Sequence, residues 1–256
     1  MKIAVLIKSV PDTAILLRIG EDRKSVVIDD LKPVMNPYDE YALEEAVKLK
    51  EAIGGEVVVI CLGEESARKT IRTALAAGAD SALFINCSTA GAMTGRVVAK
   101  VLAAALGNMA ADIIFAGKQS VDDDASQVPE RVAEILGLGH ASGITRFTCL
   151  DGKAEVDRDI DGVICTMAMD LPALFTVSKG INNPRYPTLP NIMKAKRKEI
   201  GETTPEELGI DTGHEVPDLV VENMSQPRQK RLLKILDGDL RTQVEQLVTL
   251  IDQPAI

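Results

Sequence analysis

The sequence has few of the residues that usually perform metal or thiol chemistry. It contains two histidines, His140 and His214, no tryptophan, and four cysteines without a CxxC pair. Metal centres need several such residues close together, and neither histidine has ligand-like neighbours in the sequence. The cysteines, at positions 61, 87, 149 and 165, lie in or beside apolar stretches. They are typical of reduced thiols that pack as small hydrophobic side chains, so we expect no metal site.

Long apolar runs are also missing. The best one, residues 97–106, is interrupted by Lys100, whereas a membrane-spanning helix needs about 18 apolar residues in succession. The strand-like segment 2–7 follows the first residue directly, with neither a signal-peptide pattern nor an Arg-rich presequence. The net charge of −9 disfavours nucleic acid as the main partner, because that binding depends on basic surface. We therefore expect a cytoplasmic protein without membrane insertion; a location in an organelle matrix would require a presequence that has already been removed.

The usual fingerprints of nucleotide and hydrolase sites are absent too. The chain contains no GxGxxG, no GxxxxGK followed by Ser or Thr, and no GxSxG. Gly137-Leu138-Gly139 lacks the spacing that would continue the first of these, and is more typical of a helix end. No histidine is placed near an obvious nucleophile. A chain of this length without an acid–base or nucleophilic set indicates binding and not catalysis, so we expect no enzyme.

What the chain does contain is a regular alternation of strand and helix signals. Continuous apolar runs are typical of buried parallel strands, and apolar residues at helical spacing follow each of them. Asn36-Pro37 opens the first helix, where Asn36 is expected to cap and Asp39 to complete the capping arrangement. The expected strands are 2–8, 57–62, 81–85 and 112–116, and the expected helices are 37–53, 66–77, 94–106 and one ending at Leu136. This alternation predicts an α/β fold with a doubly wound, mostly parallel, Rossmann-like sheet.

The pattern changes after Gly139. Segments 142–150, 154–160, 163–169 and 173–177 are short and are joined by the Asp-Gly pairs at 151–152 and 161–162. Asp-Gly between such runs is a strong hairpin signal, so we expect antiparallel strands added to the edge of the sheet.

The C-terminal part has weak periodicity over residues 201–236, followed by an amphipathic helix over 240–251. We expect residues 1–200 to form one nucleotide-binding domain. Residues 201–256 are then an extended C-terminal arm that packs on another subunit. A tail packed on its own domain is the alternative.

Ligands of doubly wound sheets bind at the carboxyl ends of the strands. Three segments follow such ends: the one after Lys8, the one after Leu62, and the loop from Gly117 to Gln127. The third leads into a helix, whose first amides favour an anion such as phosphate. Its three aspartates, at 122–124, then cap the helix or accept sugar hydroxyls, while the amides near 126–128 face the phosphate. Simple capping and a Mg²⁺ site are the alternatives.

Residues 184–190 combine three prolines with Arg185, Tyr186 and Leu189. Proline fixes the backbone and removes a donor, so this segment is not a sheet interior. An ordered apolar side chain beside the basic run at 194, 196, 197 and 198 suits transient docking, because the charges steer the encounter. The alternatives are a Pro-rich turn whose leucine folds onto the core and a solvated basic strand end.

Four blocks of sequence together resemble the β subunits of electron-transfer flavoproteins. They are Val34–Glu40, Thr70–Asp80, Ala116–Asp124 and Leu171–Lys198. The similarity extends from Met1 to about residue 200, and the four blocks occur in the order found in that family.

The resemblance implies a heterodimer whose larger α subunit holds most of the FAD, and a β subunit that binds AMP in a structural role. The implied nucleotide positions are Leu6, Asn36, Pro37, Tyr38, Asp39, Leu62, Gly117, Lys118, Gln119, Ser120, Val121, Asp122, Asp123, Asp124, Ala125, Ser126, Gln127 and Val128. The implied docking positions for acyl-CoA dehydrogenase-type donors are Arg185, Tyr186, Pro187, Thr188, Leu189, Pro190 and Lys194. A flavoprotein or quinone oxidoreductase is the implied acceptor.

Two other functions compete with this one. A bifurcating branch of the same family holds a second FAD in place of AMP, and Ile7–Thr13 is similar to that branch, whereas Asp122–Ala125 favours AMP. Ser9–Thr13 also lacks the aromatic residue that family members place near the flavin. The competitor from another class is a stand-alone nucleotide-binding domain of the universal-stress type, disfavoured by the added strands, the tail and the Pro-rich segment.

Overall fold

The computed structural model describes residues 1–12, 14, 18–27, 32–150, 152–212, 220–226 and 235–252. Thr13, in the segment compared above with the bifurcating branch, lies outside them. The chain divides into two compact units, one made of Met1–Arg18 and Val26–Val221, the other of Ile19–Ser25 and Glu222–Ile256. Each unit is described by itself.

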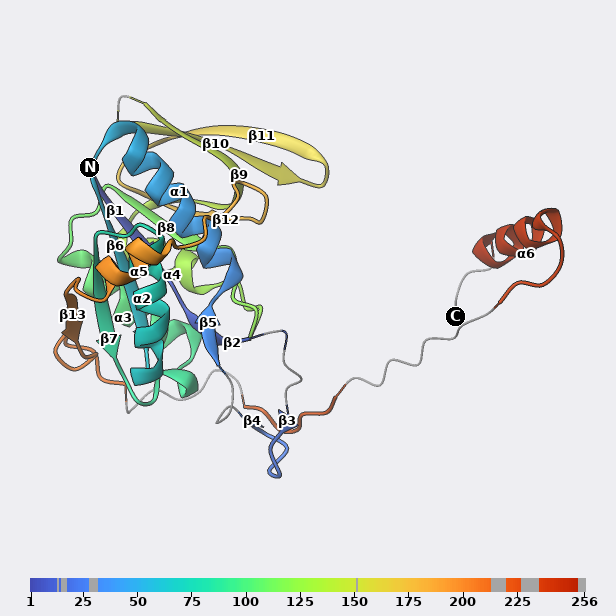
Figure 1. Cartoon of the computed structure of the whole chain (residues 1–256), viewed down its shortest axis with the longest axis horizontal. Helices are drawn as coiled ribbons and strands as arrows, with labels where there is room; N and C mark the ends of the chain where they lie inside the picture. The colour runs from blue at the N-terminus through green and yellow to red at the C-terminus, as the bar shows by residue number, and fades with distance from the viewer. Residues whose placement is uncertain are drawn as a thin grey trace. The chain divides into compact units, whose positions relative to one another are not determined.

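A nine-stranded sheet forms the first unit, in the order β11-β10-β9-β12-β8-β1-β6-β7-β13 (Figure 1). Its strands are β1 (Lys2–Leu6), β6 (Glu56–Gly63), β7 (Ser81–Asn86), β8 (Ile113–Gly117), β9 (Gly139–Leu150), β10 (Lys153–Ile160), β11 (Val163–Asp170), β12 (Ala173–Val177) and β13 (Ile200–Thr203). Each strand is parallel to its neighbour along the series β9, β12, β8, β1, β6, β7 and β13. The β9–β10 and β10–β11 pairs of this sheet are antiparallel. The predicted doubly wound sheet with added antiparallel strands is confirmed.

Helices cover both faces of this sheet. The helices are α1 (Pro37–Ile53), α2 (Arg68–Ala77), α3 (Gly95–Gly107), α4 (Val128–Leu136) and α5 (Leu189–Ala195), with the 3₁₀ turns η1 (Glu65–Ala67) and η2 (Ala90–Ala92). Side chains alternate along β1: Ile3 and Val5 join the core with α1 and α2, whereas Ala4 and Leu6 join the core with α3 and α4. This alternation is the two-residue period of a strand buried on both sides.

Strand β12 does not lie where the sequence predicted it. It pairs in parallel with β8 and with β9, so it lies inside the parallel part of the sheet and not among antiparallel edge strands. The physical reason is its composition. All five residues, Ala173–Val177, are buried, and a continuous apolar run is typical of a strand covered on both faces. The antiparallel β9–β10 and β10–β11 pairs confirm the two predicted hairpins, although Asp151, in the first turn, lies outside the described residues.

Small sheets and one further helix complete the described chain. Strand β2 (Ser9–Pro11) pairs antiparallel with β5 (Pro33–Met35), and β3 (Arg18–Ile19) with β4 (Val26–Val27) forms a second two-stranded sheet. Strand β13 pairs with β7, so residues 200–203 belong to the large sheet and the predicted boundary at 200 falls at the start of a strand.

The predicted C-terminal helix is present as α6 (Leu240–Asp252). Taken by itself it buries no residue, and its apolar side chains are exposed. They are Leu240, Val244, Leu247, Val248, Leu250 and Ile251. Within the part of the chain that the structure describes, every helix is too short or too polar to cross a membrane.

Candidate functional site

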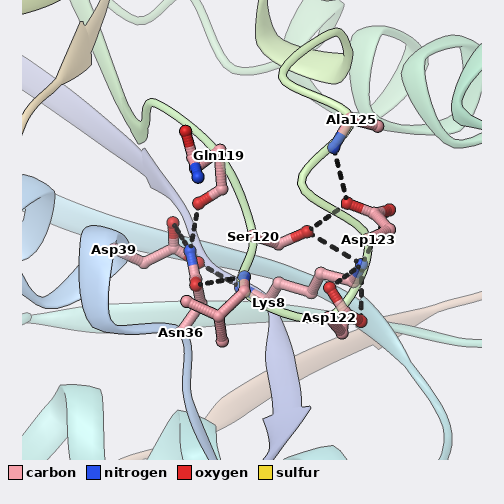
Figure 2. A network of polar contacts seen from close by, with 9 residues as sticks. Lys8, Asn36, Asp39, Gln119, Ser120, Asp122, Asp123 and Ala125 are labelled. Carbon is pink, nitrogen blue, oxygen red and sulfur yellow. Dashed lines mark hydrogen bonds and ion pairs between the residues drawn. The ribbon is translucent and has the colours of Figure 1, made fainter. Parts of the chain in front are cut away.

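The order in which the chain adds strands to the sheet reverses beside β1. From β1 the chain adds β6 and β7 on one side, and then β8 on the other, so β1 and β8 are neighbours whose carboxyl ends lie together. Ligands of open α/β sheets bind at such a point. Three segments meet there: the residues after β1, the start of α1, and the loop of residues 118–127 after β8 (Figure 2).

Asp39 joins these three segments. It lies in the first turn of α1 and is buried. Its carboxylate accepts hydrogen bonds from the backbone N–H of Lys8 at 2.7 Å, from the backbone N–H of Gly117 at 3.1 Å and from Asn36 Nδ2 at 2.9 Å. Burial raises the pKa of Asp39 to about 7, although the three donors oppose this shift. One carboxyl group thus holds the ends of β1 and β8 against α1.

Asn36 does not cap α1 with its side chain, contrary to the prediction. Its amide instead turns to the loop, donating to the Gln119 carbonyl at 2.9 Å and accepting from the Val121 N–H at 3.2 Å. The helix begins without it, because the Asn36 carbonyl accepts from the N–H groups of Asp39 and Glu40. Asn36 and Asp39 contact each other, but together they hold the start of α1 against the loop and the end of β1 and do not cap the helix.

Gly117 is required by a close approach. A Cβ atom added there would lie 2.3 Å from Asp39 Oδ1 and 2.7 Å from Tyr38 Cβ. Both neighbours belong to the first turn of α1. The absence of a side chain at Gly117 therefore lets the end of β8 contact the helix directly.

Lys8 connects the end of β1 to the aspartate loop. Its Nζ lies 2.8 Å from Asp122, 3.3 Å from Asp123 Oδ2 and 3.1 Å from Ser120 Oγ (Figure 2). The sequence analysis treated Lys8 only as the last residue of the first strand and missed this role. The signal that could have found it is a lysine directly after a buried strand, in a chain whose other site loop has three consecutive aspartates.

The aspartates bond within their own loop. Asp123 accepts from Ser120 Oγ at 2.7 Å and from the Ala125 N–H at 3.1 Å, and Asp124 accepts from Gln119 Nε2 at 2.7 Å. Gln127, which precedes α4, provides no side-chain cap. The contacts of Asp123 and Asp124 thus lie within the loop, and capping of α4 by the aspartates gains no support from them. Among the described residues, no group of three or more His, Cys, Asp or Glu side chains is placed to hold a metal ion, so the Mg²⁺ alternative gains no support.

The backbone at the end of the loop is unusual. Asp124 and Ser126 have positive φ values of 49° and 46°, which non-glycine residues seldom adopt. These turns bring the chain to the start of α4 at Val128. Leu6 ends β1, and Leu62 lies near the end of the neighbouring strand β6. Leu6 and the predicted sets 36–39 and 117–128 therefore meet at one edge of the sheet.

The predicted docking segment is attached to α1 by polar contacts. Arg185 forms ion pairs with Glu44 at 2.8 Å and with Glu51 at 2.6 Å. Asn182 Nδ2 donates to Glu45 Oε2 at 2.9 Å and to the Tyr41 carbonyl. The guanidinium of Arg185 is thus directed to carboxylates of α1.

Two apolar side chains that follow Arg185 in the sequence are exposed to solvent. Tyr186 is 94% exposed and Leu189 is 79% exposed. Leu189 is the first residue of α5, which Thr188 caps by accepting from the Asn191 N–H. The alternative in which Leu189 folds onto the core is wrong, and the expected loop ends in a short helix.

The basic run divides into two kinds of residue. Lys194, Lys196 and Arg197 are exposed. Lys198 instead donates to the carbonyls of Leu75 and Ala79 at the end of α2, a favourable place for a cation. Burial lowers its pKa. Lys198 therefore contributes to the packing of α2, and only the other three remain as candidates for steering.

Comparison with known proteins decides the family. The model of the electron transfer flavoprotein domain matches residues 25–208. A human protein named electron transfer flavoprotein subunit beta is 38% identical over 229 residues, which are 88% of this chain and 90% of the relative. A Bacillus subtilis protein of the same name is 35% identical over 258 residues, which are 100% of this chain and 99% of the relative. The chain belongs to the electron-transfer flavoprotein β-subunit family.

Family membership confirms the resemblance and removes the universal-stress alternative. Members of the electron-transfer flavoprotein family are named as electron carriers. A rice relative, 39% identical over 90% of this chain and 91% of its own length, carries "mitochondrial" in its name. Because relatives differ in this respect, the cytoplasmic location of this chain stays a prediction.

Proposed function

We propose that the chain is the smaller subunit of a heterodimeric electron-transfer flavoprotein and performs no substrate chemistry of its own. It holds AMP at the edge of the sheet described above, while a larger α subunit holds most of the FAD. It accepts electrons from acyl-CoA dehydrogenase-type donors and passes them to a flavoprotein or quinone oxidoreductase. The printed name "subunit beta" in the relatives supports a partner subunit.

One observation supports the nucleotide most directly. The loop of residues 118–127 lies where the strand order reverses and leads into α4, whose start has no side-chain cap. A helix start of this kind presents amides and the positive end of the dipole to an anion. Leu6, Leu62 and residues 36–39 line the neighbouring strand and helix ends. The nucleotide content of the purified heterodimer tests this: one FAD and one AMP are expected, and two FAD would indicate the bifurcating form.

Replacing Ser126 with glutamate is expected to lower AMP affinity about tenfold or more, because a carboxylate then faces the phosphate. The matched control is Ser126→Gln, which has the same size without the charge and should bind nearly as the wild type. Titration calorimetry with AMP measures both. Equal affinity of the glutamate and glutamine variants would place the phosphate elsewhere.

Leu189→Ala is expected to lower electron transfer from the partner dehydrogenase about tenfold, if about 1.4 kcal/mol of contact is lost. The melting temperature should hardly change, because the side chain is exposed. Leu174→Ala is the matched control: that leucine is fully buried, and its loss should cost about 2–5 kcal/mol of stability. A large fall in melting temperature for Leu189→Ala with normal transfer would make Leu189 a structural residue.

We also propose that the C-terminal arm packs mainly on the larger subunit. The arm was predicted to begin at residue 201, but β13 places residues 200–203 in the sheet, so the proposal concerns Glu222–Ile256. Its support is α6, which has an exposed apolar side and buries none of its residues.

A further inference from the structure

We propose that Lys8 is a positioning residue for the anion-binding loop: its ammonium neutralises the carboxylates of Asp122 and Asp123 and holds them in place. The inference rests on the proposed nucleotide site and adds a residue that sequence reasoning did not assign to it. It also resolves a conflict, since three consecutive aspartates are otherwise a poor neighbour for phosphate.

The side chain of Lys8 starts from a fixed point. Its backbone N–H donates to Asp39 Oδ2 at 2.7 Å, and its carbonyl accepts from the Asn36 N–H at 3.0 Å. Both partners belong to the start of α1, which is buried at these residues. With its backbone fixed on both sides, only the side-chain torsions of Lys8 remain to be ordered when it contacts the loop.

The ammonium then meets three acceptors of one loop. These are Ser120 Oγ at 3.1 Å, Asp122 at 2.8 Å and Asp123 Oδ2 at 3.3 Å (Figure 2). Ser120 Oγ also donates to Asp123 Oδ1 at 2.7 Å, and the Ala125 N–H donates to the same oxygen. Lys8 thus completes a closed set of contacts that turns both carboxylates towards β1.

The charges on the loop make such a cation necessary. Desolvation raises the pKa of Asp123, but the bonds from Ala125 and Ser120 and the charge of Lys8 outweigh it, and the pKa is lowered. Asp123 therefore stays ionised at neutral pH. A carboxylate that is not neutralised repels a phosphate bound close to it. The ammonium of Lys8, which contacts Asp122 and Asp123, removes part of this repulsion.

Exposure separates this role from fold stability. The side chains of Lys8, Asp122 and Asp123 are 42%, 30% and 55% exposed. Ion pairs at this level of exposure contribute little to folding. Loss of Lys8 should therefore affect the ligand more than the fold.

The test is titration calorimetry with AMP on the full-length protein freed of bound nucleotide. Lys8→Met is expected to weaken AMP binding about tenfold, equivalent to about 1.4 kcal/mol. Lys8→Arg, which keeps the charge, should bind within about threefold of the wild type. The double variant Lys8→Met/Asp122→Asn is expected to recover most of the lost affinity, because a carboxylate that needs neutralising has been removed.

Two results would overturn the inference. Unchanged affinity in Lys8→Met would show that the loop needs no cation. A double variant as weak as Lys8→Met would make Lys8 a direct ligand of the phosphate. If Lys8→Met unfolds, Lys8→Gln replaces it, and unchanged affinity there has the same meaning. A wild-type chain that binds no AMP would instead contradict the proposed nucleotide site itself, before any variant is compared.

Discussion

Replacing Asp39 with alanine is expected to lower the free energy of unfolding by about 2–4 kcal/mol at pH 6. The carboxyl group accepts from the backbone N–H groups of Lys8 and Gly117, and both bonds are lost together. Each buried donor left without a partner costs about 1–3 kcal/mol. Urea unfolding followed by circular dichroism measures the loss. Because Asp39 is the common acceptor of β1, β8 and α1, AMP binding should fall as well.

The size of this loss depends on pH in a defined direction. Burial raises the pKa of Asp39 from 3.8 to about 7 in the folded chain. Between these values the folded state binds more protons than the unfolded state, so stability falls as the pH rises. The contribution of the group is fully present below about pH 4 and is lost as the pH passes 7. The difference between wild type and Asp39→Ala should therefore shrink from pH 6 to pH 8.

Asp39→Asn is the matched control for the alanine variant. It keeps one acceptor oxygen and has no proton to lose, so at pH 6 it should lose about half as much stability, with no dependence on pH from this position. An alanine variant as stable as the wild type at pH 6, or a difference that grows towards pH 8, would contradict this account of Asp39.

The double variant Leu247→Asp/Ile251→Asp is expected to weaken the heterodimer at least a hundredfold. Both side chains are exposed on α6 in the single chain. Burying one aliphatic side chain contributes about 1.5–3 kcal/mol, so the loss of two exceeds about 3 kcal/mol, which is more than a hundredfold in Kd. The Kd of the two purified subunits is measured by surface plasmon resonance.

Thr249→Asp is the control for this experiment. Position 249 lies half a helical turn from the middle of the apolar side, so an aspartate there should leave assembly unchanged. The unfolding of the sheet unit should be the same in all three chains, since α6 belongs to the other unit. A double variant that pairs with wild-type Kd would show that α6 does not contact the larger subunit.

Local patterns were sufficient for most of the fold. Strands such as 57–62 and helices such as 37–53 follow from continuous apolar runs and helical spacing, because those patterns depend on neighbours in sequence. The direction of β12 did not follow. A short buried strand looks the same in sequence whether its neighbours run parallel or antiparallel to it, and the hairpin turns before it favoured the wrong choice.

The candidate site was predicted as a set of segments but not as a set of contacts. The link between Lys8 and Asp122 joins residues 114 positions apart, and no local pattern encodes it. Asn36 shows the same limit: its capping preference is a local property, but two loop groups compete for its amide in the folded chain. The sequence thus predicted which segments form the site, whereas the contacts of Lys8 and Asn36 depend on residues distant in sequence.

Helix α1 connects the two proposed sites through one rigid element of 17 residues. Its first turn contains Asp39, and further along the same helix Glu44 and Glu51 hold Arg185. An insertion of one residue between Asp39 and Glu44 would rotate everything after it by about 100°, and both carboxylates would turn away from Arg185. The number of residues in this stretch is therefore fixed. Length variation is expected instead in turns such as that at residues 161–162, which joins β10 to β11.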